Sequence, residues 1–338
     1  MTRPSASDAS RPKRLGVLGS FVWDVIHGRD VRSTPVEEWG GITYALSAAD
    51  AALPTDWQLV PLAKVGFDLA PQARRFVGTL RHAAPDALPI EVPHPNNRVT
   101  LRYHSDERRS ECLIGGVPPW SWAGLQPLLR DLDALYINLI SGFELDLTTA
   151  QLIRQHFRGP IYCDLHSLLL GMETDGHRTY RPLPEVASWC ACFDFLQVNE
   201  DELAMLAPDG LALAATALGA GVQHLLVTLG KQGVAYFAAP GTEGALDPAH
   251  RDRRTGGALR SGGALRTARI PASPLRIEGP GDPTGCGDVW GATYFSRLLA
   301  GDIMDVALHR ATDAAARNVE HRGATGLAHH LRGELHVL

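Results

Sequence analysis

Short apolar segments recur along the chain and alternate with longer segments of helical periodicity. The apolar segments are rich in Val, Ile, Leu and Tyr and have the length of buried β-strands: residues 15–19, 59–65, 135–139, 161–163, 195–198 and 225–229. Ala- and Leu-rich segments spaced like amphipathic helices interrupt them, at residues 44–53, 123–130, 148–157 and 209–219. This alternation predicts an α/β body, a mostly parallel sheet with helices on both faces and ligands at the carboxyl ends of its strands.

Two segments, residues 25–38 and 98–114, depart from this rhythm. In the second, Val99, Leu101 and Tyr103 alternate with polar residues before a polar turn and a returning strand. We expect the two segments to form a small antiparallel sheet that covers a substrate cleft as a lid. An edge hairpin of the main sheet is the alternative interpretation.

A third segment, residues 241–274, is rich in Gly, Arg, Ala and Pro and repeats Gly-Gly-Ala-Leu-Arg at residues 256–260 and 262–266. Such a composition buries too little apolar area to offset the entropy lost on ordering. We expect a flexible insertion there, and a flexible tail at residues 1–13 ahead of one domain that spans residues 14–338.

Composition and charge favour a cytoplasmic protein that acts on small molecules. The chain of 338 residues carries 32 basic and 37 acidic residues without a basic block, which argues against a nucleic-acid partner. No apolar run is long enough to span a membrane, and the first residues do not resemble a secretory signal. Five cysteines without paired C-x-x-C units favour a reducing compartment over a zinc site.

The segment at residues 279–288 carries the chemistry. A glycine-rich turn leads there into an apolar helix, and Gly285 and Gly287 allow the backbone to approach a ligand closely. Backbone N–H groups at a helix start bind phosphate oxygens, and Asp288 stands beside them as a candidate general base. The alternative is an aspartate that merely caps the helix.

The sequence Asp-Pro-Thr-Gly-Cys-Gly-Asp at residues 282–288 resembles the Asp-Thr-x-Gly-Ala-Gly-Asp signature of the ribokinase-like (PfkB) carbohydrate kinase family. The resemblance implies a ribokinase-like three-layer sandwich with a small antiparallel lid sheet. It also implies that Asp288 is the catalytic base and that the amides of Gly285, Cys286 and Gly287 form an anion hole. Pro283 and Cys286 depart from the usual residues, but neither removes a group that the chemistry uses.

The resemblance extends to the acceptor side. The Gly-Ser-Phe-Val-Trp-Asp sequence ending at Asp24 is similar to an early family element whose aspartate binds substrate hydroxyls, and Gly40 and Gly41 resemble the family's substrate turn. Arg98 in the lid is a further candidate substrate contact. Ala45 stands where ribokinases usually have Asn, so the resemblance does not imply ribose as the substrate. In isolation, Asp24 is more typical of a loop or capping residue, and Gly40 and Gly41 are more typical of a simple turn.

The donor side is implied by an Asn-x-x-Glu element at Asn199 and Glu202, which would help to place Mg²⁺ and the phosphates. The same pattern is a helix capping box, and the two interpretations are compatible. A Thr-Leu-Gly-x-x-Gly hairpin resembles the family's nucleotide contact, so ATP is the expected donor. With Thr284 of the main motif, the nucleotide-binding candidates are Asn199, Thr228, Gly230 and Gly233. The family also makes a monovalent cation such as K⁺ a possible cofactor.

The predicted function is ATP-dependent phosphorylation of a hydroxyl group on a sugar or related small polyol, by a homodimer that pairs through the lid. A nucleoside kinase of the same fold and a catalytically silent sugar- or nucleoside-binding protein are the alternatives. A dinucleotide-dependent oxidoreductase is disfavoured because the first strand is not followed by G-x-G-x-x-G. A polar cluster at Asp164 and His166 also follows a predicted strand and could contact substrate or phosphate.

Overall fold

The computed structural model describes residues 11–27, 34–103, 109–246, 263–278 and 281–334. Its main sheet has eight strands, of which the first six in spatial order from β4 run parallel. The order is β4 (Trp57–Leu62), β1 (Lys13–Leu18), β9 (Ala134–Asn138), β10 (Ile161–Asp164), β13 (Phe195–Asn199), β14 (His224–Thr228), β15 (Val234–Ala238) and β16 (Arg266–Ile270). The predicted parallel α/β body is confirmed.

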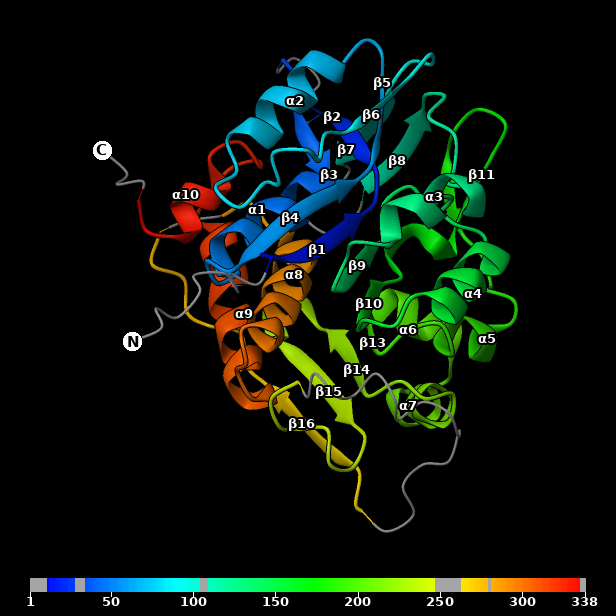
Figure 1. Cartoon of the computed structure of the whole chain (residues 1–338), viewed down its shortest axis with the longest axis vertical. Helices are drawn as coiled ribbons and strands as arrows, with labels where there is room; N and C mark the ends of the chain where they lie inside the picture. Colours follow the sequence, from blue (N-terminus) through cyan, green and yellow to red (C-terminus); the bar gives the residue numbers. More distant parts are fainter. Residues whose placement is uncertain (1–10, 28–33, 104–108, 247–262, 279–280, 335–338) are drawn as a thin grey trace, which may run out of the picture.

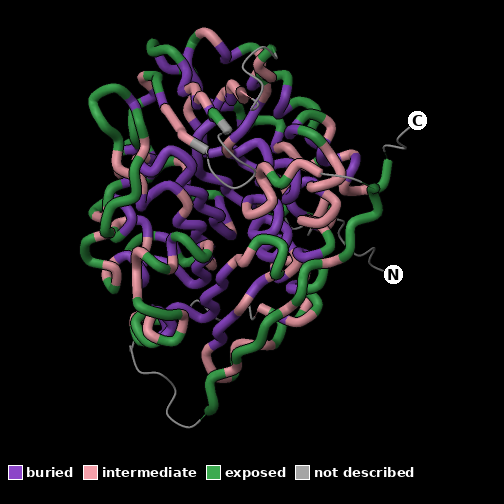
Figure 2. The backbone as a smooth tube through the Cα atoms, turned by 180° about the vertical axis from the view of Figure 1, so that it is seen from behind, coloured by how far each residue is buried: buried purple, intermediate pink, exposed green. Residues whose placement is uncertain are grey.

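Helices cover both faces of this sheet (Figure 1). One face packs against α1 (Ile42–Ala52), α2 (Ala70–Gly78), α8 (Cys286–Leu299), α9 (Met304–Val319) and α10 (Leu327–Leu331). The other packs against α3 (Trp122–Leu129), α4 (Leu147–His156), α5 (Val186–Cys190), α6 (Glu200–Leu206) and α7 (Gly210–Gly219). Because both faces are buried, consecutive strand residues such as Tyr136 and Ile137 pack into separate hydrophobic clusters on the two faces of the sheet. Figure 2 shows the buried residues gathered in the interior of the molecule and the exposed residues mainly along its outside.

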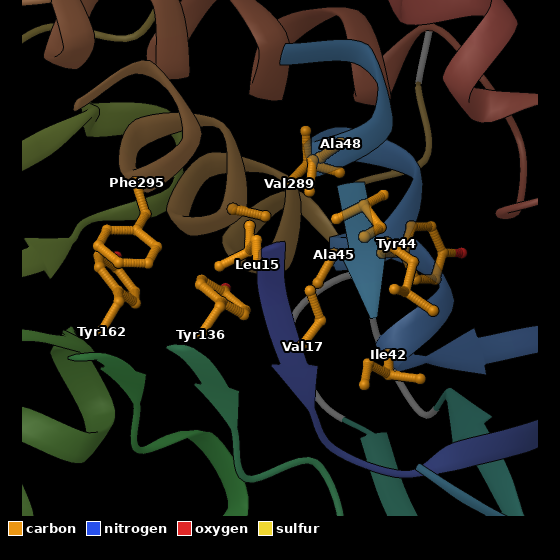
Figure 3. Packing of buried hydrophobic residues seen from close by; sticks show 14 of the residues in the cluster. Leu15, Val17, Ile42, Tyr44, Ala45, Ala48, Tyr136, Tyr162, Val289 and Phe295 are labelled. Carbon is orange, nitrogen blue, oxygen red and sulfur yellow. The ribbon is translucent and has the colours of Figure 1, made fainter. Parts of the chain in front are cut away.

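Aromatic and aliphatic side chains together form the core beneath α8 (Figure 3). The rings of Tyr136 on β9 and Tyr162 on β10 stack with centroids 5.0 Å apart, and Phe295 of α8 packs on Tyr162 at 5.5 Å. These large side chains fix the position of α8 over the middle of the sheet.

A separate four-stranded sheet is formed by β3 (Val36–Gly41), β2 (Phe21–His27), β7 (Asn97–Tyr103) and β8 (Arg109–Ile114), in that order. Its apolar face contacts Ile140 in the loop that follows β9, so the sheet lies over the carboxyl end of the main sheet. The expected small sheet is present, but its central pair, β2 and β7, runs parallel rather than antiparallel. The reason is that both strands leave the body in the same direction, β2 after β1 and β7 after β6 (Ile90–Val92).

The edge strand β8 lies against a hairpin formed by β11 (Leu170–Met172) and β12 (Arg178–Tyr180). Leu113 of β8 donates a backbone hydrogen bond to the carbonyl group of Gly176, and a β-bridge joins Cys112 to His177. The small sheet is therefore tied to the body along this edge. Another small pair is formed by β5 (Lys64–Gly66), which follows β4 in the chain, and β6.

The segment expected as a flexible insertion, residues 241–274, contains a strand that the sequence interpretation missed. β16 pairs antiparallel with β15 over five residues and forms the edge of the main sheet. Its side chains are mostly exposed, so burial left no apolar signal in the sequence. Residues 247–262, which include the first Gly-Gly-Ala-Leu-Arg copy, lie outside the described residues, as does the tail at 1–10.

Within the described ranges, no single helix has the length and hydropathy needed to cross a membrane. α6 and α7 meet the criterion only as a pair, and they are bent by 70° at their junction.

Candidate active site

A row of polar side chains crosses three neighbouring strands at their carboxyl ends. Asn138 of β9 pairs in register with Asp164 of β10, which pairs in register with Gln197 of β13. Side chains in register on adjacent strands point to the same face of a sheet, so these three lie side by side under the start of α8. All three are buried, in a body whose other strand residues are mainly apolar. A buried polar row of this kind needs partners within the site.

The turn before α8 is held in a conformation that only glycine adopts readily. Gly285 has φ of +75°, and a Cβ atom there would overlap the ring of Tyr44 in α1. Asn318 of α9 donates a hydrogen bond to the carbonyl oxygen of Thr284 at 2.8 Å, and the Thr284 amide donates to Asp282 at 2.9 Å. These contacts hold the turn immediately before the N-terminus of α8, and a helix N-terminus is where an anion would be stabilised.

Cys286 contributes its backbone rather than its thiol to this turn. Burial raises the pKa of the thiol to about 11, so the thiol is protonated at neutral pH. The sulfur lies 3.3 Å from Asn318 Nδ2 and 3.6 Å from the carbonyl oxygen of Ala315. The Cys286 amide donates to the carbonyl oxygen of Pro283 at 3.1 Å, so the backbone of this residue helps to close the turn.

Asp288 occupies the first turn of α8 and faces the polar row. Its side chain is buried, and Asn138 Nδ2 donates a hydrogen bond to Asp288 Oδ1 at 2.6 Å. Burial raises the pKa of Asp288 to about 7, while the Asn138 hydrogen bond acts in the opposite direction. A carboxylate with a pKa near neutrality is suited to accept a proton from a hydroxyl group.

Two further carboxyl groups lie close to Asp288. Burial raises the pKa of Glu202 to about 8, and it raises that of Asp164 well above the usual range, with the charges of Glu202 and Asp288 adding to the effect. Glu202 is also half of a capping box: Asn199 Oδ1 accepts from the Glu202 amide at 2.8 Å, and Glu202 Oε2 accepts from the Asn199 amide at 2.9 Å. The capping interpretation of this motif is thus correct, and it leaves the carboxyl group near the site.

In the described part of the chain, no three His, Cys, Asp or Glu side chains are arranged to hold a metal ion directly. Mg²⁺ keeps several waters and needs only one or two protein carboxylates beside the phosphates of its ligand. The buried, mutually repelling carboxyl groups of Asp164 and Glu202 fit that requirement, because a divalent cation would offset their charge.

On the acceptor side, Asp24 of β2 is buried against β3. A Cβ atom at Gly40 would overlap the Asp24 carboxylate, and one at Gly41, where φ is +60°, would lie 2.6 Å from the carbonyl oxygen of Ser20. The two glycines therefore make room for Asp24 and for the sharp entry into α1. Thr43 reinforces this entry by donating to the carbonyl oxygen of Gly40 at 2.8 Å.

Arg98 does not lie beside Asp24 and the two glycines. It pairs in register with Trp23, whereas Asp24 pairs with Val99, so Arg98 and Asp24 point to opposite faces of the small sheet. The Arg98 guanidinium donates instead to Asp68 at 2.9 Å.

The candidate donor residues follow β14. Thr228 ends that strand in register with Asn199 of β13, which places the two at the same edge of the sheet. Gly230 has φ of +52° and open space around its α-carbon, and Gly233 has φ of +93° with the β16 backbone against it. The hairpin turn therefore presents bare backbone beside the end of the sheet.

Comparison with known proteins agrees with this geometry. Residues 177–330 match the model of the pfkB family carbohydrate kinases, a segment that includes the Asn199 element, the β14–β15 hairpin and Asp288. The resemblance to the PfkB carbohydrate kinase family is confirmed. No curated protein matches the sequence.

Solved structures of several kinases share the fold over nearly the whole chain. A pyrophosphate-dependent kinase in the ribokinase family, as a sulfate complex, has a TM-score of 0.69 at 15% identity and covers 92% of this chain and 96% of its own. Burkholderia thailandensis nucleoside kinase in complex with inosine has a TM-score of 0.66 at 16% identity, covering 93% of both chains. Arabidopsis thaliana ribokinase with ribose and ATP has a TM-score of 0.63 at 17% identity, covering 95% and 99%. The ribokinase-like fold is confirmed by these likenesses.

The PfkB motifs did not point to Asn138, Gln197 or Tyr44, which the structure places around Asp288 and Gly285. Asn138 and Gln197 had a signal in the sequence, because each interrupts an apolar strand near its carboxyl end. Tyr44 had none, since a tyrosine in an apolar helix is typical of a core position.

Proposed function

We propose that this chain is a kinase that transfers the γ-phosphoryl group of ATP to a hydroxyl group of a sugar or related small polyol. The observation that carries the proposal is the buried carboxylate of Asp288, which has a pKa near neutrality and lies on the same helical turn as the anion-binding amides. A base and an anion site one residue apart are what an in-line phosphoryl transfer to a hydroxyl needs.

In the proposed reaction, Asp288 accepts the proton of the acceptor hydroxyl as its oxygen forms a bond to the γ-phosphorus. The bond between that phosphorus and the bridging oxygen breaks, and ADP leaves. The amides of Gly285, Cys286 and Gly287 stabilise the charge on the transferred phosphoryl group. Asp24, which Gly40 allows to approach, accepts hydrogen bonds from other hydroxyl groups and so orients the acceptor.

The donor lies along the turn after β14 in this proposal, with Thr228, Gly230, Gly233 and Thr284 beside the nucleotide. Asn199, Glu202 and Asp164 would hold the hydration shell of Mg²⁺, which supplies positive charge to the donor phosphates when bound. A monovalent cation such as K⁺ near the loop at residues 323–326 remains part of the proposal. Its expected signature is a rise in turnover when K⁺ replaces a large organic cation at constant ionic strength.

A polyol is favoured over ribose as acceptor because α1 carries Ala45 where ribokinases usually have Asn, so one polar contact is missing. A nucleoside acceptor is the second candidate, and one structural neighbour is a nucleoside kinase with bound inosine. A silent binding protein is disfavoured because Asp288 is retained with a hydrogen-bonded partner.

The experiment that tests the proposal follows phosphoryl transfer by ³¹P NMR across acceptors and donors. The acceptors are aldoses, ketoses, inositols and nucleosides, and the donors are Mg-ATP and pyrophosphate, since one neighbour is a pyrophosphate-dependent kinase. A new phosphomonoester from ATP and one polyol class supports the proposal. A phosphomonoester formed only from pyrophosphate would overturn the donor, and tight acceptor binding without transfer from either donor would overturn the kinase activity.

We also propose that the chain is a homodimer that pairs through the lid. Ile114 lies on the outer face of the small sheet with 56% of its surface exposed, an apolar group that a second copy would cover. Light scattering coupled to size exclusion tests this: a dimer that Ile114→Glu converts to a monomer supports it, and a monomeric wild type contradicts it.

A further inference from the structure

The side chain of Gln197 connects two parts of the site that belong to different layers. Its Nε2 donates to Asp164 Oδ2 at 2.8 Å and to the carbonyl oxygen of Gly287 at 3.1 Å, while its Oε1 accepts from the Tyr162 hydroxyl at 2.5 Å. Gln197 is 2% exposed, so water does not compete for these bonds. Both N–H groups and the carbonyl group of the amide are thus used.

These partners determine the orientation of the amide. The carbonyl oxygen of Gly287 is only an acceptor, so it must face the NH₂ group of Gln197. With the amide turned over, two carbonyl oxygens would face one another in a buried site, at a cost of about 1–3 kcal/mol. The Tyr162 hydroxyl then donates to the remaining oxygen. The hydrogen bonds of Gln197 therefore fix both the orientation of its amide and the contact between β13 and α8.

Helix α8 is shaped to receive this amide. A Cβ atom at Gly291 would overlap Gln197 Oε1 and would lie 2.9 Å from the hydroxyl oxygens of both Tyr136 and Tyr162. A Cβ atom at Gly287, one turn earlier on the same face, would lie 3.5 Å from Gln197 Nε2, which is an ordinary contact distance. The absence of a side chain at Gly291 therefore makes the room that polar groups from three strands fill.

Side chains from neighbouring elements hold the first turn of α8: Asn138 on Asp288, Asn318 on Cys286 and Gln197 on Gly287. Gly285 is the N-cap residue and provides no side-chain hydrogen bond to the N–H groups of the first turn. Gln197 instead holds the peptide between Gly287 and Asp288 from below, through the carbonyl group of Gly287. That peptide orients both the adjoining amides and the Asp288 side chain.

We propose that Gln197 is a positioning residue of the phosphoryl-transfer site, which locks the first turn of α8 to Asp164. The proposal rests on the kinase activity proposed above. Gln197 does not contact the reacting atoms, so it acts on the transition state through the amides and carboxylate it positions. Its loss should therefore lower kcat while the acceptor still binds.

The test compares Gln197→Leu with Gln223→Leu. Gln223 is a matched control because its buried amide also donates to an aspartate, Asp194, but at the opposite end of the sheet. We expect Gln197→Leu to lower kcat about 100-fold with the acceptor KM within about threefold of wild type. Gln223→Leu should keep the wild-type kcat, although both variants lose thermal stability.

Hydrogen exchange gives a readout that does not need turnover. Amides of residues 286–290 should exchange about tenfold faster in Gln197→Leu than in wild type, and at the wild-type rate in Gln223→Leu. If Gln197→Leu does not fold, Tyr162→Phe decides, because it removes only the hydroxyl that orients the amide and should change kcat and exchange in the same direction.

Equal effects of the two glutamine substitutions on kcat would show a merely structural role and overturn the proposal. Wild-type kcat and unchanged exchange in Gln197→Leu would do the same. A wild-type protein without phosphoryl transfer would instead overturn the kinase activity, and the exchange rates would still report whether Gln197 holds the turn.

Discussion

The side-chain amide of Asn138, at the end of β9, donates a hydrogen bond of 2.6 Å to Asp288, in the first turn of α8. The two residues are 150 positions apart in the chain, and both are buried. Since burial raises the pKa of Asp288 to about 7 and this bond opposes the rise, Asn138 adjusts the basicity of the proposed catalytic base.

Replacing Asn138 with Leu should raise the pKa of Asp288 further. A base acts when it is deprotonated, so kcat/KM should rise with pH through the pKa of Asp288, and the variant's rise should occur at higher pH. A hydrogen bond to a charged group is worth about 1.5–3 kcal/mol, which predicts an upward shift of about one to two pH units. Rate profiles between pH 5 and 9 measure it, and coincident profiles would show that the bond does not influence the base.

Gly40→Ala should weaken acceptor binding. The new methyl group would overlap the Asp24 carboxylate, so Asp24 must move away from the orientation that the glycine allows. We expect the acceptor KM to rise about tenfold with a smaller change in kcat. Gly78→Ala is the matched control, because a Cβ atom there meets no other atom within 4 Å. A similar KM for the two variants would argue against a role for Asp24 in acceptor binding.

Stability should depend on pH in a way that Asp288→Asn reveals. Asp288, Glu202 and Asp164 all have pKa values raised by burial, to about 7, to about 8 and well above the usual range. Between about pH 4 and 8 the unfolded chain has lost these protons while the folded chain retains them, so they make stability fall as pH rises.

Removing one such group should make Asp288→Asn progressively more stable than wild type across that range. Thermal unfolding of both proteins from pH 4.5 to 8 gives the difference in Tm. A difference that is constant with pH would mean that the Asp288 pKa is not raised in the folded protein.

The sequence predicted the body of the fold because both faces of the parallel strands are buried, so the strands are short apolar runs that periodicity detects. The sequence interpretation missed β16, because the side chains of this exposed edge strand do not form a short apolar run. The parallel pairing of β2 with β7 was also missed, since strand direction depends on where the chain re-enters a sheet rather than on the residues within it.

The candidate site divides in the same way. Asp288 and the glycine turn are contiguous, so a local motif predicts them. Asn138 and Gln197 each interrupt an apolar strand, but their partners depend on the register between strands and on the helix that crosses them, which no local pattern encodes. Arg98 was assigned from its place in a lid strand, but its face and its partner Asp68 depend on pairing with β2.

The most direct test of the account is the turnover of Asp288→Asn with the acceptor identified for the wild-type protein, under saturating Mg-ATP and beside a binding measurement for that acceptor. Removing the base should lower kcat at least about 1,000-fold, while the acceptor Kd stays within about threefold of wild type. A variant that binds the acceptor and transfers phosphate at the wild-type rate would contradict the assignment of Asp288 as the base.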